Sequence, residues 1–311
     1  MGCDVVRCRS VGNENPKTII AFFDMSGSLI GKYLLVICFC FYQNYLFGQV
    51  YTTDDGVKRD KHFIYQVKEI DEFFERFNDD PASFIRAVYR ERHRKFNITR
   101  QRLIKSLFNY ENTSWDSTMM LRFVSEVTNK KNPIYLDFYG DNWYAELTCR
   151  FRYNSSSIVI PVVMKIEMTQ NGGSKWMIVG VGQSRLKSNI VVREMAESKI
   201  KTKCLSPTSH ATNFVSLKRA LDDKENLSNY FENSYFNRSN MLAFYNAVLN
   251  RQIEFSHVIK IKYHFLLADK WIFTVEDFPR ETLYSGWLIN HMQKVSSSSM
   301  ENYKNKLLGV N

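Results

Sequence analysis

Two long runs of alternating side chains in the middle of the chain constrain its fold more than any other feature. Apolar and polar residues alternate from Trp143 to Tyr153, and the run from Ile158 to Met168 repeats the pattern after a turn at 154–157. Because successive side chains of a strand point to opposite faces, a period of two predicts strands with one buried face. Both runs are therefore predicted to be β-strands that bury the same face.

Two further strands are predicted on either side of this pair. Ile134–Tyr139 alternates in the same way and is followed by the turn 140–142. Asn171-Gly172-Gly173 is a hairpin signal before the run Lys175–Val181, because these residues readily adopt the backbone angles of a tight turn. The stretch Pro133–Gln183 is therefore predicted to be a meander of four antiparallel strands.

The segments before this meander have the spacing of short amphipathic helices. Apolar residues recur at intervals of three and four in Val67–Phe77, Leu103–Phe108 and Met120–Val127. This spacing places them on one face of each helix, where they can cover the apolar face of a sheet. The predicted fold class is α+β, with helices packed on an antiparallel sheet.

Three short helices followed by a curved antiparallel sheet resemble the cone-shaped fold of nuclear transport factor 2 and its ketosteroid isomerase relatives. The resemblance covers residues 63–184, with Glu69–Asn78 similar to the opening helix and Lys175–Val181 to a late strand. It implies helices packed on a curved sheet. That fold hosts binding modules, assembly domains and enzymes, so it does not assign a function by itself.

The C-terminal part of the chain repeats the helix-then-strands pattern in a shorter form. Asn240–Asn250 has helical spacing, Ile253–Leu267 and Trp271–Phe278 are predicted strands, and Leu283–Val295 can add another. We therefore expect a second, smaller α+β domain. The expected organisation is a linker at 49–62, a first domain at 63–184, a linker at 185–212, a second domain at 213–295 and a polar tail at 296–311.

The N-terminal region has the parts of a secretory signal peptide. Tyr33–Tyr42 is an apolar core that follows Lys32, and Gly48 is a small residue at the expected cleavage point. A membrane span needs about 20 apolar residues, so this core is too short to be one. We predict a signal peptide at 25–48, cleavage near Gly48, and a secreted or periplasmic mature chain without a transmembrane span. An uncleaved short anchor or a buried helix is the alternative.

The same leader bears on where the chain begins. Signal peptides begin close to their initiator, so Met25 is a better start than Met1, and residues 1–24 are then upstream sequence. A leader that ends in a small residue before Gln49 is similar to those of many secreted proteins of Bacteroidetes-type bacteria.

Export leaves two cysteines in the mature chain. Cys149 and Cys204 can form one disulfide in an oxidising compartment. Alternatively, Cys149 is a small buried apolar residue, since it lies on the apolar side of its predicted strand. The spacing of cysteines and histidines does not suit zinc, so no metal site and no cofactor are predicted.

A basic segment follows the first predicted helix. The net charge of +10 favours anionic surfaces, and this segment holds a group of cations. They are Arg86, Arg90, Arg94, Lys95, Arg100, Arg102 and Lys105. One interpretation is binding of an anionic envelope or extracellular polymer, and the preferred one is a solvated helix face. No nucleic acid is expected, because no aromatic side chains are interleaved with the cations.

The polar residues that come closest to a catalytic group are Asp137, Tyr139 and Glu146. Enzymes with the cone-shaped fold use a carboxylate and a tyrosine for proton transfer, so the resemblance implies such a role for these residues. The same predicted face also carries cations, which favours cross-strand charge pairing on a wet face. We prefer this second interpretation.

Three functional hypotheses follow. The first is an exported, non-enzymatic binding or assembly protein whose partner is not specified by the sequence. The second is a small-molecule isomerase or dehydratase with Asp137 or Glu146 as the base. The third is binding of an anionic polymer through Arg86 to Lys105. An enclosed apolar pocket holding one desolvated carboxylate would support the enzyme, whereas a solid core would support the binding protein.

Overall fold

The computed structural model describes residues 66–92, 98–169, 171–182, 186, 203–236, 239–267, 270–282 and 284–310. The expected signal peptide at 25–48, the residues before it, the linker at 49–62 and most of the linker at 185–212 lie outside these ranges. So do Arg94 and Lys95 of the basic segment.

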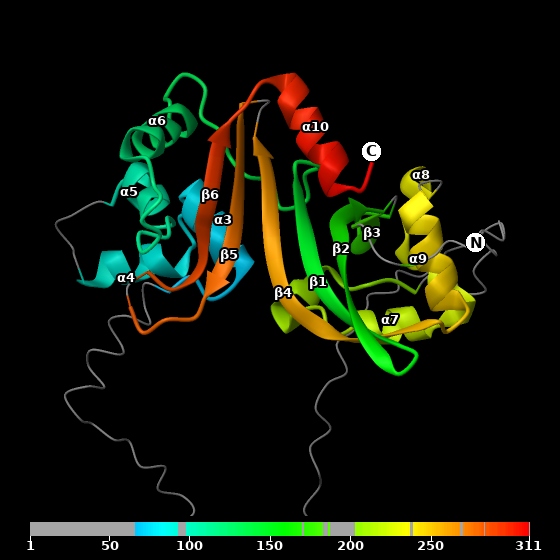
Figure 1. The fold of residues 1–311 in the computed structure, drawn as a ribbon. Coiled ribbons are helices and arrows are strands. Elements are labelled where there is room, and N and C mark those ends of the chain that lie inside the picture. The colour runs from blue at the N-terminus through cyan, green and yellow to red at the C-terminus, as the bar shows by residue number, and fades with distance from the viewer. Residues whose placement is uncertain are drawn as a thin grey trace, which may run out of the picture. The chain divides into compact units, whose positions relative to one another are not determined.

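A curved six-stranded antiparallel sheet forms the centre of the described structure (Figure 1). Its strands follow the order β3-β2-β1-β4-β5-β6, and helices pack against it. The strands are β1 (Trp143–Tyr153), β2 (Ser156–Met168), β3 (Ser174–Val181), β4 (Ile253–Leu267), β5 (Trp271–Phe278) and β6 (Gly286–Lys294). The predicted α+β class is confirmed.

The long pairing of β1 with β4 unites the two predicted domains in one sheet. It runs from Trp143 opposite Phe265 to Tyr153 opposite Ile253. An unpaired β1 edge would expose a row of backbone N–H and C=O groups, and β4 satisfies them. The described residues all belong to one compact unit. The second domain expected at 213–295 is therefore not confirmed, since its strands extend the sheet of the first.

One face of the sheet, here called the inner face, carries the main hydrophobic core. The alternation predicted for β1 is observed, because Trp143, Ala145, Leu147, Cys149 and Phe151 are all buried there. Among the residues that the structure describes, the helices before the sheet are α3 (Ile70–Asn78), α4 (Phe84–Arg92), α5 (Arg100–Lys105) and α6 (Ser117–Val127). Between β3 and β4 lie η1 (Pro207–Thr212), α7 (Leu217–Asp222), η2 (Lys224–Tyr230), α8 (Asn233–Phe236) and α9 (Ser239–Leu249).

Local capping signals set the ends of the helices before the sheet. The Asp116 carboxylate accepts hydrogen bonds from the amides of Thr118 and Met119, which begins α6. Helix α3 ends at Asp79, whose φ of 62° is left-handed and stops the helix. The apolar faces of both helices are buried in the main core.

Residues Ile134–Tyr139, predicted to be the first strand of the meander, form no strand in the structure. The Asn78 amide takes the place of a partner strand. Its Nδ2 donates to the Leu136 carbonyl at 2.7 Å, and its Oδ1 accepts from the Leu136 amide at 2.8 Å. The Ile134 carbonyl accepts from Arg100. Because side chains satisfy this backbone, the segment needs no neighbouring strand, and the meander has three strands instead of four.

The opposite, outer face of the sheet is covered by a helix within the segment that was expected to be a polar tail. Helix α10 (Ser297–Leu307) begins at Ser296, whose side chain accepts from the Ser299 amide. Met300 and Leu308 are buried against the sheet. They join a second core with Tyr144, Val163, Met177, Val179, Leu266 and Ile272. The helix was missed because only a few apolar residues interrupt its polar sequence.

Within the described part of the chain, no helix combines the length and the apolar character needed to cross a membrane.

Candidate functional site

The predicted catalytic residues lie in separate environments. Asp137 and Tyr139 are exposed in the irregular segment before β1, where the Asp137 carboxylate accepts from the Tyr139 amide at 2.9 Å. Glu146 lies on the outer face of β1 and binds His264 of β4. The structure therefore does not assemble the carboxylate–tyrosine group that the first strand would have supplied.

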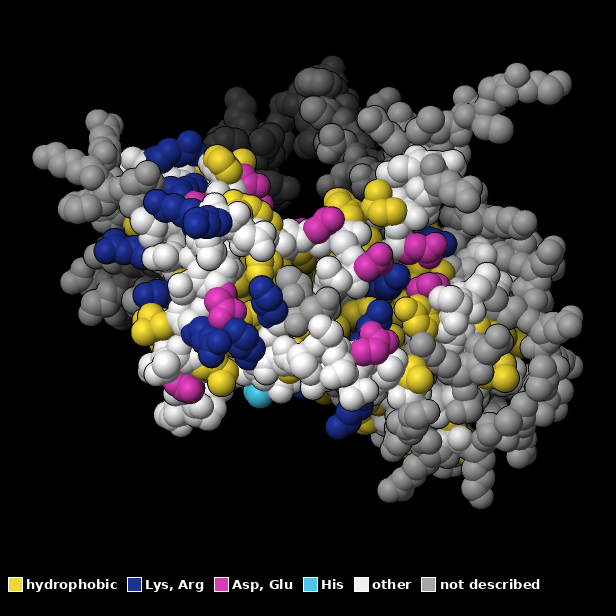
Figure 2. All heavy atoms as spheres, turned by 90° about the horizontal axis from the view of Figure 1, so that it is seen from above, with side chains coloured by type: hydrophobic (Ala, Val, Ile, Leu, Met, Phe, Trp, Pro, Cys, Tyr) yellow, Lys and Arg dark blue, Asp and Glu magenta, His cyan; other side chains and the backbone are white. Residues whose placement is uncertain are grey.

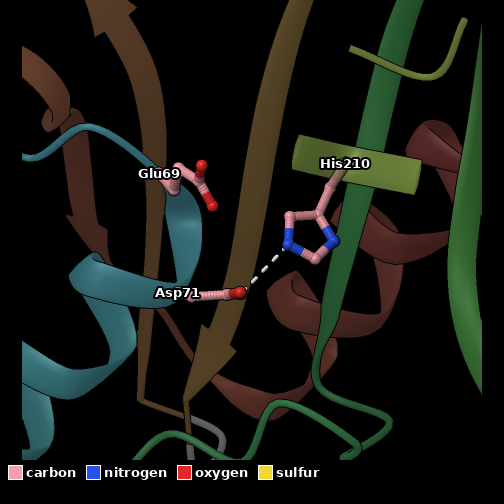
Figure 3. A group of neighbouring side chains, drawn as sticks. All are labelled: Glu69, Asp71 and His210. Atoms are coloured by element: carbon pink, nitrogen blue, oxygen red, sulfur yellow. Dashed lines mark ion pairs between the residues drawn. The ribbon is translucent and has the colours of Figure 1, made fainter. Parts of the chain in front are cut away.

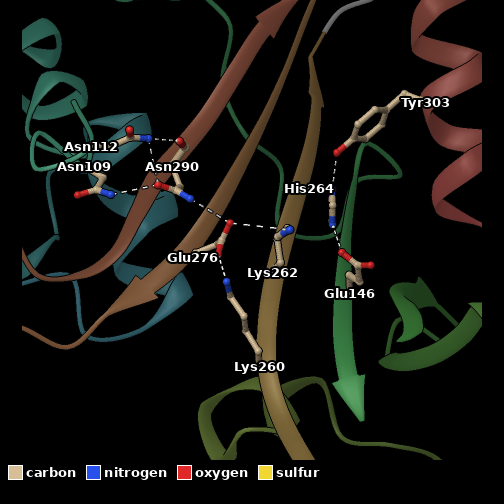
Figure 4. Close-up of polar contacts among 9 residues, drawn as sticks. All are labelled: Asn109, Asn112, Glu146, Lys260, Lys262, His264, Glu276, Asn290 and Tyr303. Atoms are coloured by element: carbon tan, nitrogen blue, oxygen red, sulfur yellow. Dashed lines mark hydrogen bonds and ion pairs between the residues drawn. The ribbon is translucent and has the colours of Figure 1, made fainter. Parts of the chain in front are cut away.

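Glu146, His264 and Tyr303 instead form a continuous hydrogen-bonded chain beneath α10 (Figure 4). His264 Nε2 lies 2.9 Å from Glu146 Oε2, and His264 Nδ1 lies 2.6 Å from the Tyr303 hydroxyl. Because a carboxylate only accepts, Nε2 carries a hydrogen. In the neutral ring Nδ1 then accepts from the Tyr303 O–H. The hydrogen bonds thus fix the tautomer.

The pKa shifts of Glu146 and Tyr303 favour the protonation states that these hydrogen bonds need. The hydrogen bond from His264 lowers the pKa of Glu146, although burial acts in the opposite direction. Burial, assisted by the Glu146 charge, raises the pKa of Tyr303 to about 12. Both ring nitrogens of the buried His264 are occupied by protein groups. The chain therefore fastens α10 to the sheet, and His264 has no ring nitrogen available for a substrate.

A second polar network crosses the outer face toward β6 (Figure 4). The buried Glu276 carboxylate pairs with Lys260 and accepts from Asn290 Nδ2 at 3.2 Å. Asn290 in turn accepts from Asn109 Nδ2 at 3.0 Å. Burial opposes the charge on Glu276, but the donors from Lys260 and Asn290 outweigh it and lower the pKa. Such a network fixes β4, β5, β6 and the segment after α5 in one arrangement.

Cross-strand ion pairs of the kind expected from the sequence occur at two places, although the face is not wet throughout, because Tyr144 is buried beside α10. Arg152 of β1 pairs with Glu254, its register partner on β4. Lys175 of β3 lies 3.6 Å from Glu167 of β2, also its register partner. Charges directly opposite each other on neighbouring strands attract each other and support the strand pairing, although solvent screens exposed pairs.

Of the described cations of the basic segment, Arg86 and Arg100 bind other groups of the protein. Arg86 pairs with Asp79, and Arg100 donates to the carbonyls of Phe77, Val127 and Ile134. Burial lowers the pKa of Arg100, and the three carbonyl oxygens that accept its hydrogen bonds stabilise the charged guanidinium. Arg90 lies on α4, and Arg102 and Lys105 on α5, with Arg102 exposed. Arg86 and Arg100 thus act within the fold.

The disulfide considered from the sequence is not formed between Cys149 and Cys204, both of which the structure describes. Cys149 is fully buried on the inner face, and burial raises the pKa of its thiol. It packs as a small apolar residue, as the alternative interpretation proposed.

A groove lies between α5, the residues after it and α6. It has a volume of about 390 Å³ and is lined by Lys105, Phe108, Tyr110, Asn112, Thr113, Trp115, Ser117, Met120, Leu121 and Val124. Leu121 is 56% exposed and Tyr110 is 42% exposed. We call this the α5–α6 groove. In a view from above, lysine and arginine side chains gather over the part of the molecule that holds α4–α6 (Figure 2).

A further group of ionisable residues was not predicted from the sequence. Glu69 and Asp71, at the start of α3, meet His210 of η1 (Figure 3). Asp71 Oδ1 lies 3.1 Å from His210 Nε2. Strands β1, β2 and β3 lie between Asp71 and His210 in the sequence, so no short-range spacing signals their proximity.

No family model, no curated protein and no solved structure matches this chain. The class that the structure itself defines is an α+β protein with helices on a curved, open antiparallel sheet. A relationship to the nuclear transport factor 2 fold stays a prediction from the order of elements.

Proposed function

We propose that this protein is a non-enzymatic binding or assembly protein. The proposal rests on the close packing of aromatic side chains on the inner face, because an enzyme with the cone-shaped fold would bind its ligand there. The ring centroid of Trp143 lies 5.4 Å from that of Trp176 and 5.8 Å from that of Phe265. The Phe265 ring lies 4.7 Å from Phe273, and all four residues are buried. Rings in mutual contact leave no room between them for a ligand.

The positions of the carboxylates favour the same conclusion. A proton-transfer enzyme needs a desolvated carboxylate facing its ligand. Glu146 is bound to His264 on the outer face, and Glu276 is paired with Lys260. Asp277 comes nearest to the requirement, because burial raises its pKa and it lines a hollow of about 300 Å³. Asp277 is nevertheless an exposed residue, so water reaches it.

The α5–α6 groove is the face that we assign to the partner. Its walls are largely aromatic and aliphatic, and Leu121 and Tyr110 expose apolar surface that a soluble partner could cover. Lys105 supplies a cation at the same place. These features suit a polypeptide segment that inserts an apolar side chain and carries a carboxylate next to it.

Peptide display tests this face directly. A peptide library is selected on the wild-type protein, and the selected peptides are measured against Leu121→Glu and against Val215→Glu. Val215 is 68% exposed and does not line the groove, so it is the matched control. We expect peptides with an apolar residue beside Asp or Glu to bind Leu121→Glu at least tenfold more weakly and Val215→Glu unchanged. Peptides that bind all three proteins equally would contradict the assignment.

The packing of the inner face is tested separately. Apolar ring compounds, such as a steroid and an anilinonaphthalene dye, are titrated into the protein while the indole signals of Trp143 and Trp176 are followed by NMR. We expect no saturable shift, because these rings are in contact with their neighbours. Saturable binding that shifts both signals would support the enzyme hypothesis instead.

A further inference from the structure

The group formed by Glu69, Asp71 and His210 combines residues from two distant parts of the chain. One ligand atom from each lies within 4.8 Å of the others. Glu69 and Asp71 come from the start of α3, and His210 comes from η1, with the three side chains directed toward a common space (Figure 3). The His210 side chain is only 3% exposed, so the protein holds the imidazole firmly.

A backbone hydrogen bond fixes which nitrogen of His210 faces the carboxylates. His210 Nδ1 lies 2.8 Å from the Pro207 carbonyl oxygen, which can only accept. Nδ1 therefore carries the hydrogen, and in the neutral ring Nε2 carries the lone pair. A histidine that donates one N–H to a backbone carbonyl and presents the other nitrogen is arranged as metal-binding histidines are.

The nitrogen presented in this way has no hydrogen-bond partner in the structure. His210 Nε2 and Asp71 Oδ1 are both buried atoms without a hydrogen bond, although they lie 3.1 Å apart. In the neutral ring two lone pairs would face each other, which is unfavourable unless a cation lies between them. The carboxylates of Glu69 and Asp71 place negative charge at the same point, which favours a cation there.

The spacing of the ligand atoms suits a divalent transition-metal ion. Zinc binds imidazole nitrogen and carboxylate oxygen at about 2.1 Å, so two ligand atoms 3.1 Å apart subtend an angle of roughly 95° at the ion. This angle lies between octahedral and tetrahedral values. Glu69 is exposed, so its carboxylate can move to complete the set.

We propose that Glu69, Asp71 and His210 bind a divalent transition-metal ion and thereby clip the start of α3 to η1. Two carboxylates and one neutral imidazole suit zinc or manganese, and water fills the remaining positions. Without an ion, Asp71 and a protonated His210 attract each other across the 3.1 Å between Oδ1 and Nε2, so the metal competes with one proton. The site is independent of the α5–α6 groove, since none of its residues lines that groove.

Zinc titration of the full chain tests the proposal. Binding is measured by calorimetry or by competition with a chromophoric chelator, and thermal unfolding is followed with zinc and with a chelator. We expect one equivalent to bind the wild type and to raise its melting temperature. His210→Gln and Asp71→Asn should each weaken binding at least tenfold and remove the rise in melting temperature. Glu69→Gln should weaken binding at least threefold.

His291→Gln is the control, because His291 is an exposed histidine outside the group. It should bind zinc as the wild type does. If His210→Gln fails to fold, Glu69→Gln carries the test, since Glu69 is exposed and its loss leaves the core intact. The proposal is overturned if the wild type binds no stoichiometric zinc, or if Glu69→Gln and His210→Gln bind it as tightly as the wild type.

Discussion

Tyr303 of α10 and His264 of β4 are joined by a hydrogen bond of 2.6 Å that fastens the C-terminal helix to the outer face of the sheet. The other nitrogen of His264 is held by Glu146, so this short chain connects α10, β4 and β1. Met300 and Leu308 supply the apolar contacts on either side. These hydrogen bonds and a small apolar core therefore hold α10 against the sheet.

Removing the Tyr303 hydroxyl tests this connection. Tyr303→Phe leaves the buried Nδ1 of His264 without a donor, and we expect a loss of about 1–2 kcal/mol in the free energy of unfolding. Tyr139→Phe is the control, because Tyr139 is 51% exposed, and it should change stability by less than about 0.5 kcal/mol. Urea unfolding gives both values. Equal effects of the two changes would show that the hydrogen bond contributes nothing.

Two glycines with left-handed backbone angles allow a comparison of strain with and without steric contact. A Cβ at Gly286, where φ is 84°, would lie 2.0 Å from the Val67 carbonyl oxygen, whereas a Cβ at Gly172, where φ is 77°, would meet nothing within 4 Å. We expect Gly172→Ala to cost about 1–2 kcal/mol through backbone strain alone. Gly286→Ala should cost roughly 3 kcal/mol or more, because it also separates Val67 from β6. Thermal unfolding of the two variants measures the difference, and a smaller loss for Gly286→Ala would refute the close approach.

Glu126 makes the stability of the protein dependent on pH in the acid range. Burial alone would raise its pKa, but hydrogen bonds from Lys294, Trp271 and Arg122 lower it from 4.5 to about 2. Since the folded-state pKa is depressed, Glu126 stabilises the protein above pH 4.5 or so and loses this effect as the pH falls toward about 2. The difference in unfolding free energy between wild type and Glu126→Gln should therefore shrink over this range. A difference that stays constant with pH in urea titrations would contradict the assignment.

Asn78 should be required for the order of the segment before β1. Asn78→Ala removes both hydrogen bonds to Leu136 and leaves its backbone groups without partners. We expect a loss of roughly 1–3 kcal/mol in stability and faster hydrogen exchange of the Leu136 amide. Asn132→Ala is the control at an exposed position. Unchanged exchange at Leu136 would mean that Arg100 and the end of α6 hold the segment without Asn78.

Some elements could be predicted from the sequence with accurate bounds. Ile253–Leu267 and Trp271–Phe278 are strands over the predicted residues, and Trp143–Tyr153 buries the predicted face. Helices α3, α5 and α6 overlap the three segments whose apolar residues have helical spacing. These features were predictable because a period of two or of 3.6 residues is a property of neighbouring positions in the chain.

The alternating pattern of Ile134–Tyr139 was not sufficient to predict its structure. It alternates as well as a true strand does, yet the side chains of Asn78 and Arg100 satisfy its backbone. Similarly, the sequence of α10 looks polar, and only the apolar outer face of the sheet makes Met300 and Leu308 a packing surface. In both cases the deciding partner is distant in the chain.

The sequence by itself therefore determined the segments with clear periodicity, such as β1, β4, β5 and α3, and which of their faces are apolar. The tertiary structure decided that β4 pairs with β1, so that two expected domains share one sheet, and that His210 meets Asp71. The physical reason is that strand pairing and side-chain clusters depend on contacts between residues far apart in the chain, whereas periodicity records only what each segment buries.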